Sequence, residues 1–446
     1  MFDGSSILLL LLVGIVFVIV ATARYKLHPF LALLIAAGAI GLASGMPAIT
    51  ALTAITGGFG RTVGAIGIVI ACGGMIGAIL ERSGGALSMA ESVLRLVGRK
   101  RALVAMAGTG AIVSVPVFCD SGFVLLAPLN RALSRQTGIS IASFAVALGM
   151  GLYTTHCLVP PTPGPIAVAG ELHADLGAVI LLGLVAAIPA IAASCLYARF
   201  VATRIVVAPP AAAETEPTPV TERMPAAWAF APVLVPVVLI ALKSVAAYPG
   251  SAIAGALPVL LIAGDPNVAL VLGVLIAMFA ARRHGREAIS EWCADGLRAT
   301  GVIILITAAG GALGAVLRET SLAALVGDTL TTLDLGRLNI LLPFVIAAGL
   351  KTAIGSSTVA MITTASLVGP LLGVMGLTTG SGPVLATLAI ASGSMVVSHV
   401  NDSYFWVITQ TSGLTITQGC KLITVASAIA GLTAIATVFA LSLILL

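Results

Sequence analysis

The sequence predicts an all-α polytopic membrane protein built from two inverted repeats, each with a re-entrant hairpin and a broken helix. Composition, long apolar runs and a similarity between the two halves predict this class. Of the 446 residues, 59% are hydrophobic and only 9% are charged, and the mean hydropathy is +1.15. Soluble domains carry about 25% charged residues, so a soluble fold is excluded.

Apolar runs recur along the whole chain. Several approach the ~20 residues that a spanning helix needs, and the shorter ones suit half-spanning pieces. The stretch 246–281 fits either one long or two short passes. The runs are Ile7–Ala21, Pro29–Leu42, Gly64–Leu80, Val179–Ala198, Pro232–Leu242, Val268–Ala281, Val302–Leu317 and Ile423–Leu446.

The charges and cysteines exclude other classes. A net charge of +5 would suit acidic partners in a soluble protein, but in a membrane protein basic residues mark cytoplasmic loops. No aromatic stripe accompanies them, so nucleic-acid binding is excluded. The six cysteines form no CxxC pair, so neither a disulfide framework nor a metal or other cofactor site is indicated. The basic clusters are Arg24/Lys26, Arg95/Arg99/Lys100/Arg101, Arg131/Arg135, Arg199/Arg204 and Arg282/Arg283/Arg286.

A polar segment divides the chain into two halves. "APPAAAETEPTPVTERMP" (208–225) has the composition of a flexible linker. It predicts a first transmembrane repeat over 1–205, a cytoplasmic linker over 206–226 and a second repeat over 227–446. "GGMIGAILERSG" (73–84) aligns with "GGALGAVLRETS" (310–321) at an offset of 237, which indicates a duplication.

The basic loops predict that the repeats are inverted. The loop 95–101 follows the helix Gly64–Leu80, which therefore runs outside to inside. The matching helix Gly301–Leu317 begins just after Arg286 and runs inside to outside. Inverted repeats are typical of secondary transporters.

The first interrupted segment is "VSVPVFCDSGFVLLAPL" (113–129). Residues 102–117 and 122–129 are each too short to span, so a re-entrant hairpin over about 102–130 is predicted, with Asp120 at its tip. Non-helical backbone at membrane depth is tolerated only inside protein or beside water. Asp120 then marks either a site or a cap for the N–H groups of Gly122 and Phe123.

The matching segment in the second half is "LKTAIGSSTVAMITTASLVGPLL" (350–372), within a hairpin predicted over about 340–375. Its break, Gly355 to Thr358, offers backbone N–H groups and hydroxyls at the start of a half-helix, an arrangement that suits an anion. Lys351, just before the break, either binds a carboxylate or snorkels to the interface.

Two further segments interrupt helices later in each half. In "THCLVPPTPGPIAVAG" (155–170), four prolines leave too few backbone donors for a regular helix. His156 precedes this break and is either structural or a ligand. In "SGSMVVSHVNDSYFW" (392–406), four polar side chains fall within five residues, which indicates a site: His399, Asn401, Asp402 and Ser403.

These segments also carry a family resemblance that extends from residue 28 to 406. The chain resembles the gluconate permease family of proton symporters, within the ion-transporter superfamily. The matching motifs are "HPFLALL" (28–34), "GFGRTVGAIG" (58–67), "ERSGGA" (81–86), "PVFCDSGFVLLAPL" (116–129), "THCLVPPTPGP" (155–165), "GSSTVAMITTAS" (355–366) and "SHVNDSYFW" (398–406).

The resemblance implies uptake of gluconate or a related small hydroxy- or sugar-acid anion across the bacterial inner membrane with a proton. It also implies two inverted repeats with re-entrant hairpins, and usually a homodimer with an elevator motion. The chain departs from the family pattern near the expected site, which concerns the substrate more than the mechanism. The departures are Cys119, Asp120, Ser121, Thr162, Lys351 and Tyr404.

On this hypothesis, the substrate carboxylate binds to Lys351 and to the hairpin residues Ser356, Ser357 and Thr358. Asp120 or Asp402 carries the proton, because burial favours a neutral carboxyl group. The titratable alternatives are His156 and His399. The full expected substrate-binding set is Ser121, Thr155, His156, Lys351, Ser356, Ser357, Thr358, His399, Asn401 and Ser403.

Three alternatives stay open at the level of sequence. The same fold could couple to sodium through an oxygen cage at Ser356, Thr358, Asn401 and Asp402, or it could carry an amino acid such as D-serine with a proton. An intramembrane enzyme that uses Asp120 with a histidine is disfavoured, because broken helices in two repeats indicate a carrier.

Overall fold

The structure is a computed structural model. It describes residues 13–14, 16–18, 20–22, 24–98, 101–207, 224–247, 253, 257–320 and 336–446. All regular structure within these ranges is helical, which confirms the predicted all-α class. Most of the predicted helix Ile7–Ala21 and most of the predicted linker lie outside the described residues.

Seven described helical segments are long and apolar enough to cross a membrane, as the sequence predicted for a polytopic protein. Shorter apolar helices lie between them, including α2 (Pro29–Ala43) and α12 (Pro266–Ala280). The seven segments are Ala48–Arg82, Ile141–Glu171, Leu176–Arg204, Ala226–Ala247, Arg286–Glu319, Gly336–Ile354 and Ile416–Leu445.

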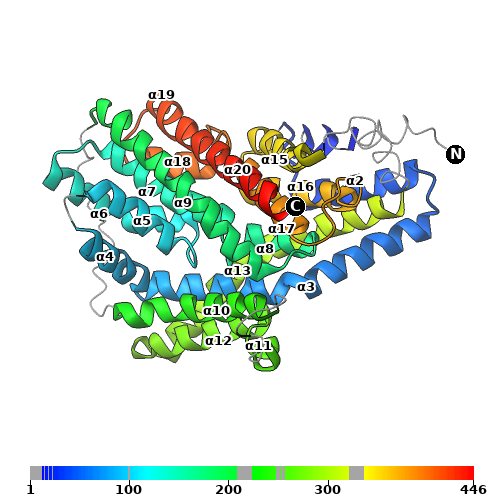
Figure 1. The fold of residues 1–446 in the computed structure, drawn as a ribbon, viewed down its shortest axis with the longest axis horizontal. Helices are drawn as coiled ribbons and strands as arrows, with labels where there is room; N and C mark the ends of the chain where they lie inside the picture. Colours follow the sequence, from blue (N-terminus) through cyan, green and yellow to red (C-terminus); the bar gives the residue numbers. More distant parts are fainter. Residues whose placement is uncertain are drawn as a thin grey trace.

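The two longest helices, α3 (Ala48–Arg82) and α13 (Arg286–Glu319), lie side by side along the molecule (Figure 1). Gly58 of α3 faces Gly311 of α13, whereas Gly74 faces Gly296. Residue numbers rise along α3 while the numbers of the facing residues in α13 fall, so the two helices are antiparallel. Because glycine has no side chain, the two backbones approach closely at both contacts.

The other helices flank this pair (Figure 1). On one side lie α10 (Ala226–Ala247), α11 (Leu257–Ala263) and α12. Within the stretch 246–281, the described residues form the end of α10 and the two short helices α11 and α12. On the other side lie the helices that carry the interrupted segments, together with α9 (Leu176–Phe200), α19 (Ile416–Gly419) and α20 (Val425–Leu445). The helices with interrupted segments are α5 (Ala102–Val113), α6 (Cys119–Thr137), α7 (Ile141–Leu158), α8 (Pro163–Glu171), α15 (Leu341–Ile354), α16 (Ser357–Val368), α17 (Gly382–Gly393) and α18 (Ser403–Thr411).

Several of these helices begin at residues that are typical of helix N-termini. Ser140 caps α7 by accepting a hydrogen bond from the Ala142 N–H, and Asp175 caps α9 at 2.7 Å from the Ala178 N–H. Asp265 caps α12, whose first residue is a proline. A side-chain oxygen at the N-cap satisfies an otherwise unpaired N–H, and proline suits the first helical position because it has no N–H.

The structure breaks the chain at all four segments singled out in the sequence. Non-helical residues separate α7 from α8 at 159–162 and α17 from α18 at 394–402. Short turns join α5 to α6 and α15 to α16. One detail differs from the expectation, because α6 does not stop at 129. It continues through Pro128 to Thr137, so the second arm of the first hairpin is a helix of 19 residues.

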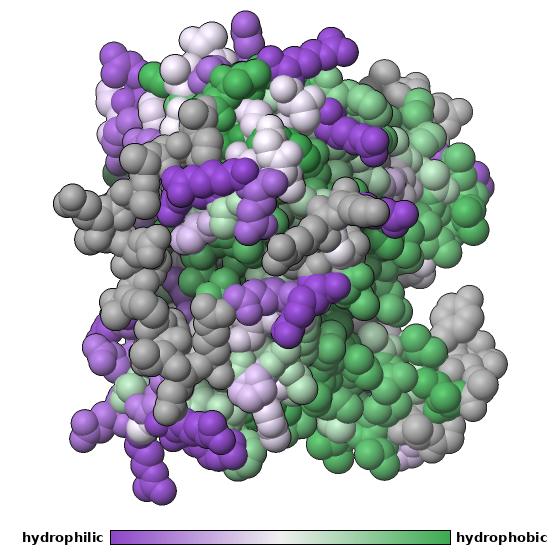
Figure 2. All heavy atoms as spheres, turned by 90° about the vertical axis from the view of Figure 1, so that its left-hand side faces the viewer, coloured by the Kyte–Doolittle hydropathy of each residue, from purple (hydrophilic) through white to green (hydrophobic). Residues whose placement is uncertain are grey.

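Basic residues gather at one end of the molecule. The start of α5, the end of α6, the end of α9 and the turn after α12 all lie at the left of Figure 1, and Figure 2 shows groups of hydrophilic side chains on this end, beside a hydrophobic area. Basic loops lie on the cytoplasmic side of a membrane protein, so we assign this end to the cytoplasm. The cluster comprises Arg101, Arg131, Arg135, Arg199, Arg204, Arg282, Arg283 and Arg286.

Replacing Gly58 by alanine is expected to destabilise the α3–α13 contact. A Cβ at this position would lie 2.6 Å from the Gly311 carbonyl oxygen and 2.6 Å from the Ala315 Cβ, and overpacking of this kind costs about 1–3 kcal/mol. Gly60→Ala is the matched control, because a Cβ there meets nothing within 4 Å. Thermal unfolding of the detergent-solubilised protein checks this, and equal melting temperatures for the two variants would contradict the contact.

Candidate functional site

The tip of the second hairpin lies directly against the break before α18. Gly355 ends α15 with φ +89°, a left-handed conformation that glycine adopts without strain. A Cβ at Gly355 would collide with the carbonyl group of Asn401, whose carbon would lie only 2.7 Å away. Glycine is therefore required twice here, for the turn and for the close approach of the two segments.

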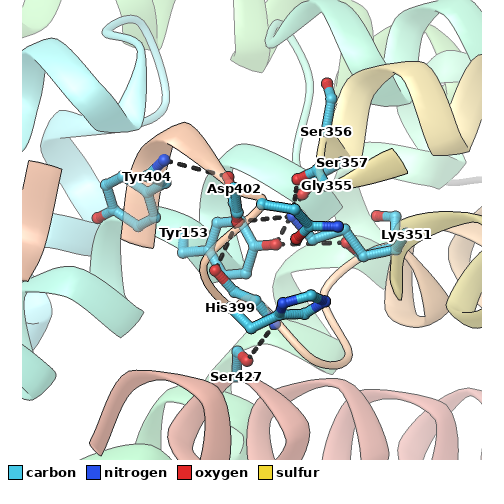
Figure 3. Close-up of polar contacts among 12 residues, drawn as sticks. Tyr153, Lys351, Gly355, Ser356, Ser357, His399, Asp402, Tyr404 and Ser427 are labelled. Carbon is cyan, nitrogen blue, oxygen red and sulfur yellow. Dashed lines mark hydrogen bonds and ion pairs between the residues drawn. The ribbon is translucent and has the colours of Figure 1, made fainter. Parts of the chain in front are cut away.

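Lys351 forms a buried ion pair with Asp402 across this contact (Figure 3). Its Nζ lies 2.6 Å from Asp402 Oδ2, and the two side chains are 0% and 6% exposed. The ammonium group also donates to the Gly355 carbonyl oxygen and lies 5.7 Å from the centre of the Tyr153 ring. Lys351 therefore points into the protein, and the snorkelling alternative is wrong.

The carboxylate of Asp402 is held from three directions. It accepts hydrogen bonds from the Ser398 hydroxyl and, at 3.1 Å, from the Tyr404 N–H, which makes it the N-cap of α18. The Ser398 N–H in turn donates to Ser427 of α20 at 2.9 Å. Between these residues and the end of α17, Val397 has φ +60°, which is unusual for a β-branched residue. The surrounding contacts hold this strained loop in place.

Two buried tyrosines connect the ion pair to α7. The Tyr153 hydroxyl lies 2.6 Å from the Ser357 hydroxyl, at the start of α16. The Tyr404 hydroxyl donates to the Gly149 carbonyl at 2.8 Å, and the two rings are stacked with centroids 5.3 Å apart. Sequence reasoning missed both residues as site residues. The available signal was a tyrosine inside an apolar segment, because a buried phenol usually has a hydrogen-bond partner.

Asp120 lies in the first turn of α6, on the other side of the cluster. One carboxylate oxygen contacts the Cys119 thiol at 3.7 Å, and Oδ1 is buried without a hydrogen-bond partner among the described residues. The N-cap of α6 is Phe118, with no side-chain capping bond, so the capping alternative for Asp120 is not observed. Asp402 and Lys351 both interact electrostatically with Asp120.

His156 is buried near the end of α7, and Thr155 beside it is buried as well. The imidazole packs against Phe118 with ring centroids 5.9 Å apart, and its Nδ1 has no partner among the described residues. The ring lines a cavity of about 10 Å³ together with Pro116 and Pro161. A space of this size holds about one water molecule, so the first hairpin and the first break are closely packed here.

Three residues that were predicted to bind substrate form hydrogen bonds with the backbone in this structure. His399 Nε2 lies 3.0 Å from the Thr352 carbonyl oxygen, and Asn401 donates to the same oxygen at 2.9 Å, which satisfies the C-terminal end of α15. Ser356 is the N-cap of α16 and points away from the ion pair in Figure 3.

Of the other residues predicted to bind substrate, some lie at the Lys351–Asp402 cluster and others do not. Ser357 lies at the cluster through Tyr153. Thr358 and Ser121 are partly buried, and Ser403 is exposed. The structure therefore gathers Lys351 and Asp402 with Ser357 into one cluster, with Asp120 and His156 at its edge.

This architecture defines a class of protein, the polytopic helical membrane proteins. The fold is similar to that of the YdaH transporter of Alcanivorax borkumensis, with a TM-score of 0.65, 14% identity and 87% of each chain covered. It is also similar to MtrF of Neisseria gonorrhoeae, whose structure is described as illuminating a class of antimetabolite efflux pumps. For that pair the TM-score is 0.64 and the identity 16%, over 88% of this chain and 83% of the other.

The chain belongs to the GntP family of permeases, whose family profile matches residues 6–444. It is 35% identical to a gluconate permease of Pseudomonas aeruginosa over 100% of this chain and 99% of the relative. It is 32% identical to the Gnt-II system L-idonate transporter of Escherichia coli, over 98% and 99% of the two chains. The protein is therefore a multi-pass membrane permease and not an enzyme.

Removing one partner of the buried Lys351–Asp402 pair is expected to destabilise the protein. Lys351→Met leaves Asp402 charged and unpaired, which should lower the free energy of unfolding by about 3–5 kcal/mol, whereas adding Asp402→Asn should restore most of it. The half-exposed pair of Lys243 and Asp265, 3.9 Å apart, provides the control. Lys243→Met should cost less than about 1 kcal/mol.

Thermal unfolding of the four purified proteins measures these differences. A double variant no more stable than Lys351→Met alone would show that the two charges do not stabilise each other.

Proposed function

We propose that this permease imports gluconate, or a related small hydroxy- or sugar-acid anion, across the bacterial inner membrane by proton symport. The observation that carries the proposal is the buried ion pair of Lys351 and Asp402 at the contact between the second hairpin and the second helix break. The relatives named as gluconate permease and L-idonate transporter support the substrate class, since both names refer to sugar acids.

The ion pair offers a direct route for coupling an anion to a proton. In the structure, the Lys351 ammonium group binds Asp402, so it is not available to a substrate carboxylate. Protonation of Asp402 removes its negative charge and releases Lys351 to bind the incoming carboxylate. Substrate and proton together then keep the buried charges balanced, whereas either alone would leave an uncompensated charge at a high energetic cost.

The neighbouring groups suit the remaining tasks. The hydroxyls of Ser357 and Tyr153 lie beside the ion pair and would bind the substrate's oxygens, with Thr155 close by. Asp120 is the second candidate for the proton, because its carboxylate has a buried oxygen without a partner among the described residues. His156 is a third candidate, because its Nδ1 is buried without a partner among the described residues.

The helix order supports two inverted repeats. Pro266 and Ala280, which bound α12, lie 237 positions after Pro29 and Ala43, which bound α2, and the same offset aligned the glycine motifs. The α3–α13 contacts follow a local two-fold pattern as well. Gly74 meets the stretch around Gly296 and Thr300, and Gly311, 237 positions after Gly74, meets Gly58 and Thr62.

An elevator motion is supported by a difference in the contacts that equivalent positions of the two repeats make. Gly73 of α3 contacts Pro161 of the first break, but Gly310, its counterpart in α13, contacts Ile362 and Ser366 of α16. Equivalent positions of the central pair thus touch different parts of the site-bearing helices. This is expected if those helices slide along the pair and the structure represents one end of the range. A homodimer is proposed from the superfamily resemblance, and native mass spectrometry tests it.

Sodium coupling is disfavoured by the position of Lys351. The Asp402 carboxylate and the Gly355 carbonyl are two of the oxygen ligands that a cation site at this contact would use, and the ammonium group already binds both. A sodium ion there would face a buried positive charge.

Uptake of radiolabelled gluconate into proteoliposomes tests the transport proposal. An inward proton gradient should drive accumulation, and a sodium gradient at constant pH should not. Gluconate, idonate, glycerate and D-serine are compared as competitors, because the substrate within the class is part of the proposal. Uptake that ignores an imposed pH gradient for every competitor would contradict proton symport.

Replacing each aspartate by asparagine distinguishes the two candidate proton carriers, Asp402 and Asp120. Asp402→Asn mimics the protonated state, so it should retain gluconate binding while accumulation becomes at least about tenfold less dependent on the pH gradient; a 1.4 kcal/mol change in free energy corresponds to tenfold. Asp120→Asn should leave that dependence intact if Asp402 carries the proton. The reverse pattern would assign the proton to Asp120.

A further inference from the structure

A second charged cavity lies away from the Lys351–Asp402 cluster, between α3, the end of α8 and the end of α13. Its volume is about 320 Å³, compared with about 10 Å³ for the cavity beside His156. Glycines at three wall positions leave room for it. The charged and titratable residues that line it are Arg61, Glu171, His173 and Arg318.

The charged groups are arranged around one buried carboxylate. Glu171 is 6% exposed, and its Oε1 accepts a hydrogen bond from Arg318 Nη2 at 2.8 Å, while the Arg318 side chain is 40% exposed. Arg318 therefore has further donors directed away from Glu171, because a guanidinium group carries five N–H donors. Arg61 also interacts with Glu171 electrostatically, but forms no hydrogen bond or ion pair with the described residues.

This set of charges favours an anion. Two guanidinium groups and one carboxylate leave one net positive charge when His173 is neutral. An arginine within a membrane-spanning helix usually marks a pathway or a site, and Arg61 lies in α3 as an exposed residue that lines the cavity. Paired guanidinium donors match the geometry of a carboxylate, and the Thr62 hydroxyl in the same wall can serve a ligand hydroxyl.

The cavity opens on the half of the protein opposite the basic end. Arg318 lies at the end of α13 that is far from Arg282 and Arg283. His173 precedes α9, whose other end carries Arg199. Because the basic end is assigned to the cytoplasm, the cavity lies on the extracytoplasmic side, where an imported anion would arrive first.

We propose that this cavity is a second binding site for a small monocarboxylate anion, held by Arg61 and Arg318 on the extracytoplasmic side. Glu171 positions Arg318 and competes with the ligand for it. That the bound anion is also the transported one rests on the proposed function, whereas the site itself does not.

The test is isothermal titration calorimetry on the full-length protein in detergent, with gluconate as the probe and uncharged sorbitol as the negative control. Wild type is expected to bind about two gluconates per chain. Arg61→Gln should weaken one site about tenfold or more, the loss expected for charge-assisted hydrogen bonds. Arg298→Gln is the matched control, since Arg298 lies 237 positions after Arg61 and pairs with Asp295 instead.

Two further variants separate this site from the Lys351 site and from a purely structural ion pair. The double variant Lys351→Met/Asp402→Asn should retain one binding event, which Arg61→Gln then removes. Glu171→Gln should strengthen gluconate binding severalfold, because it frees Arg318; a purely structural pair would lose thermal stability without a gain in affinity.

The outcomes are distinct. The inference is overturned if the Lys351→Met/Asp402→Asn variant binds no gluconate, if Arg61→Gln leaves its isotherm unchanged, or if Glu171→Gln does not raise affinity. If Arg61→Gln abolishes binding while the Lys351→Met/Asp402→Asn substitutions leave the isotherm unchanged, the cavity is a site and the proposed substrate site is the part that fails.

Discussion

The burial of Lys351 and Asp402 is the constraint on which the rest of the site depends. A charge removed from water is stable only if partners compensate it, and this pair recruits its partners from several separate segments. The Gly355 carbonyl comes from the second hairpin, the Ser398 hydroxyl from the second break and the Tyr404 N–H from α18. The left-handed Gly355 and the strained Val397 are what allow these segments to meet.

The Lys351–Asp402 pair stabilises the fold and is also the centre of the proposed transport site. A permanently satisfied ion pair would only stabilise the protein, but its carboxylate can be neutralised by a proton and its ammonium can be claimed by another carboxylate. In the proposed mechanism, the same two residues hold the hairpin against the break in one state and release it in another. The cavity lined by Arg61 and Arg318 also contains an incompletely paired charge, since Glu171 accepts one hydrogen bond from Arg318 and leaves its other donors available.

The sequence predicted much of the fold because membrane proteins obey simple local rules. Apolar runs predicted the spanning helices, and the prolines at 160–165 predicted the break between α7 and α8. The end of α6 was predicted less well: the second arm of the hairpin was expected over 122–129, but the helix passes through Pro128 and continues to Thr137. Lys351 and Asp402 were each singled out as polar residues in apolar segments, yet nothing local shows that they touch, because 51 positions separate them.

The sequence alone determined the class, the positions of the breaks and the residue types at the site, because each depends on local composition and backbone chemistry. Tertiary structure decided which polar residues serve the site and which serve the backbone. His399 and Asn401 look equivalent to Asp402 in sequence, but they satisfy the end of α15, whereas Tyr153 lies beside the ion pair. Only packing makes that choice, because it depends on contacts between segments far apart in the chain.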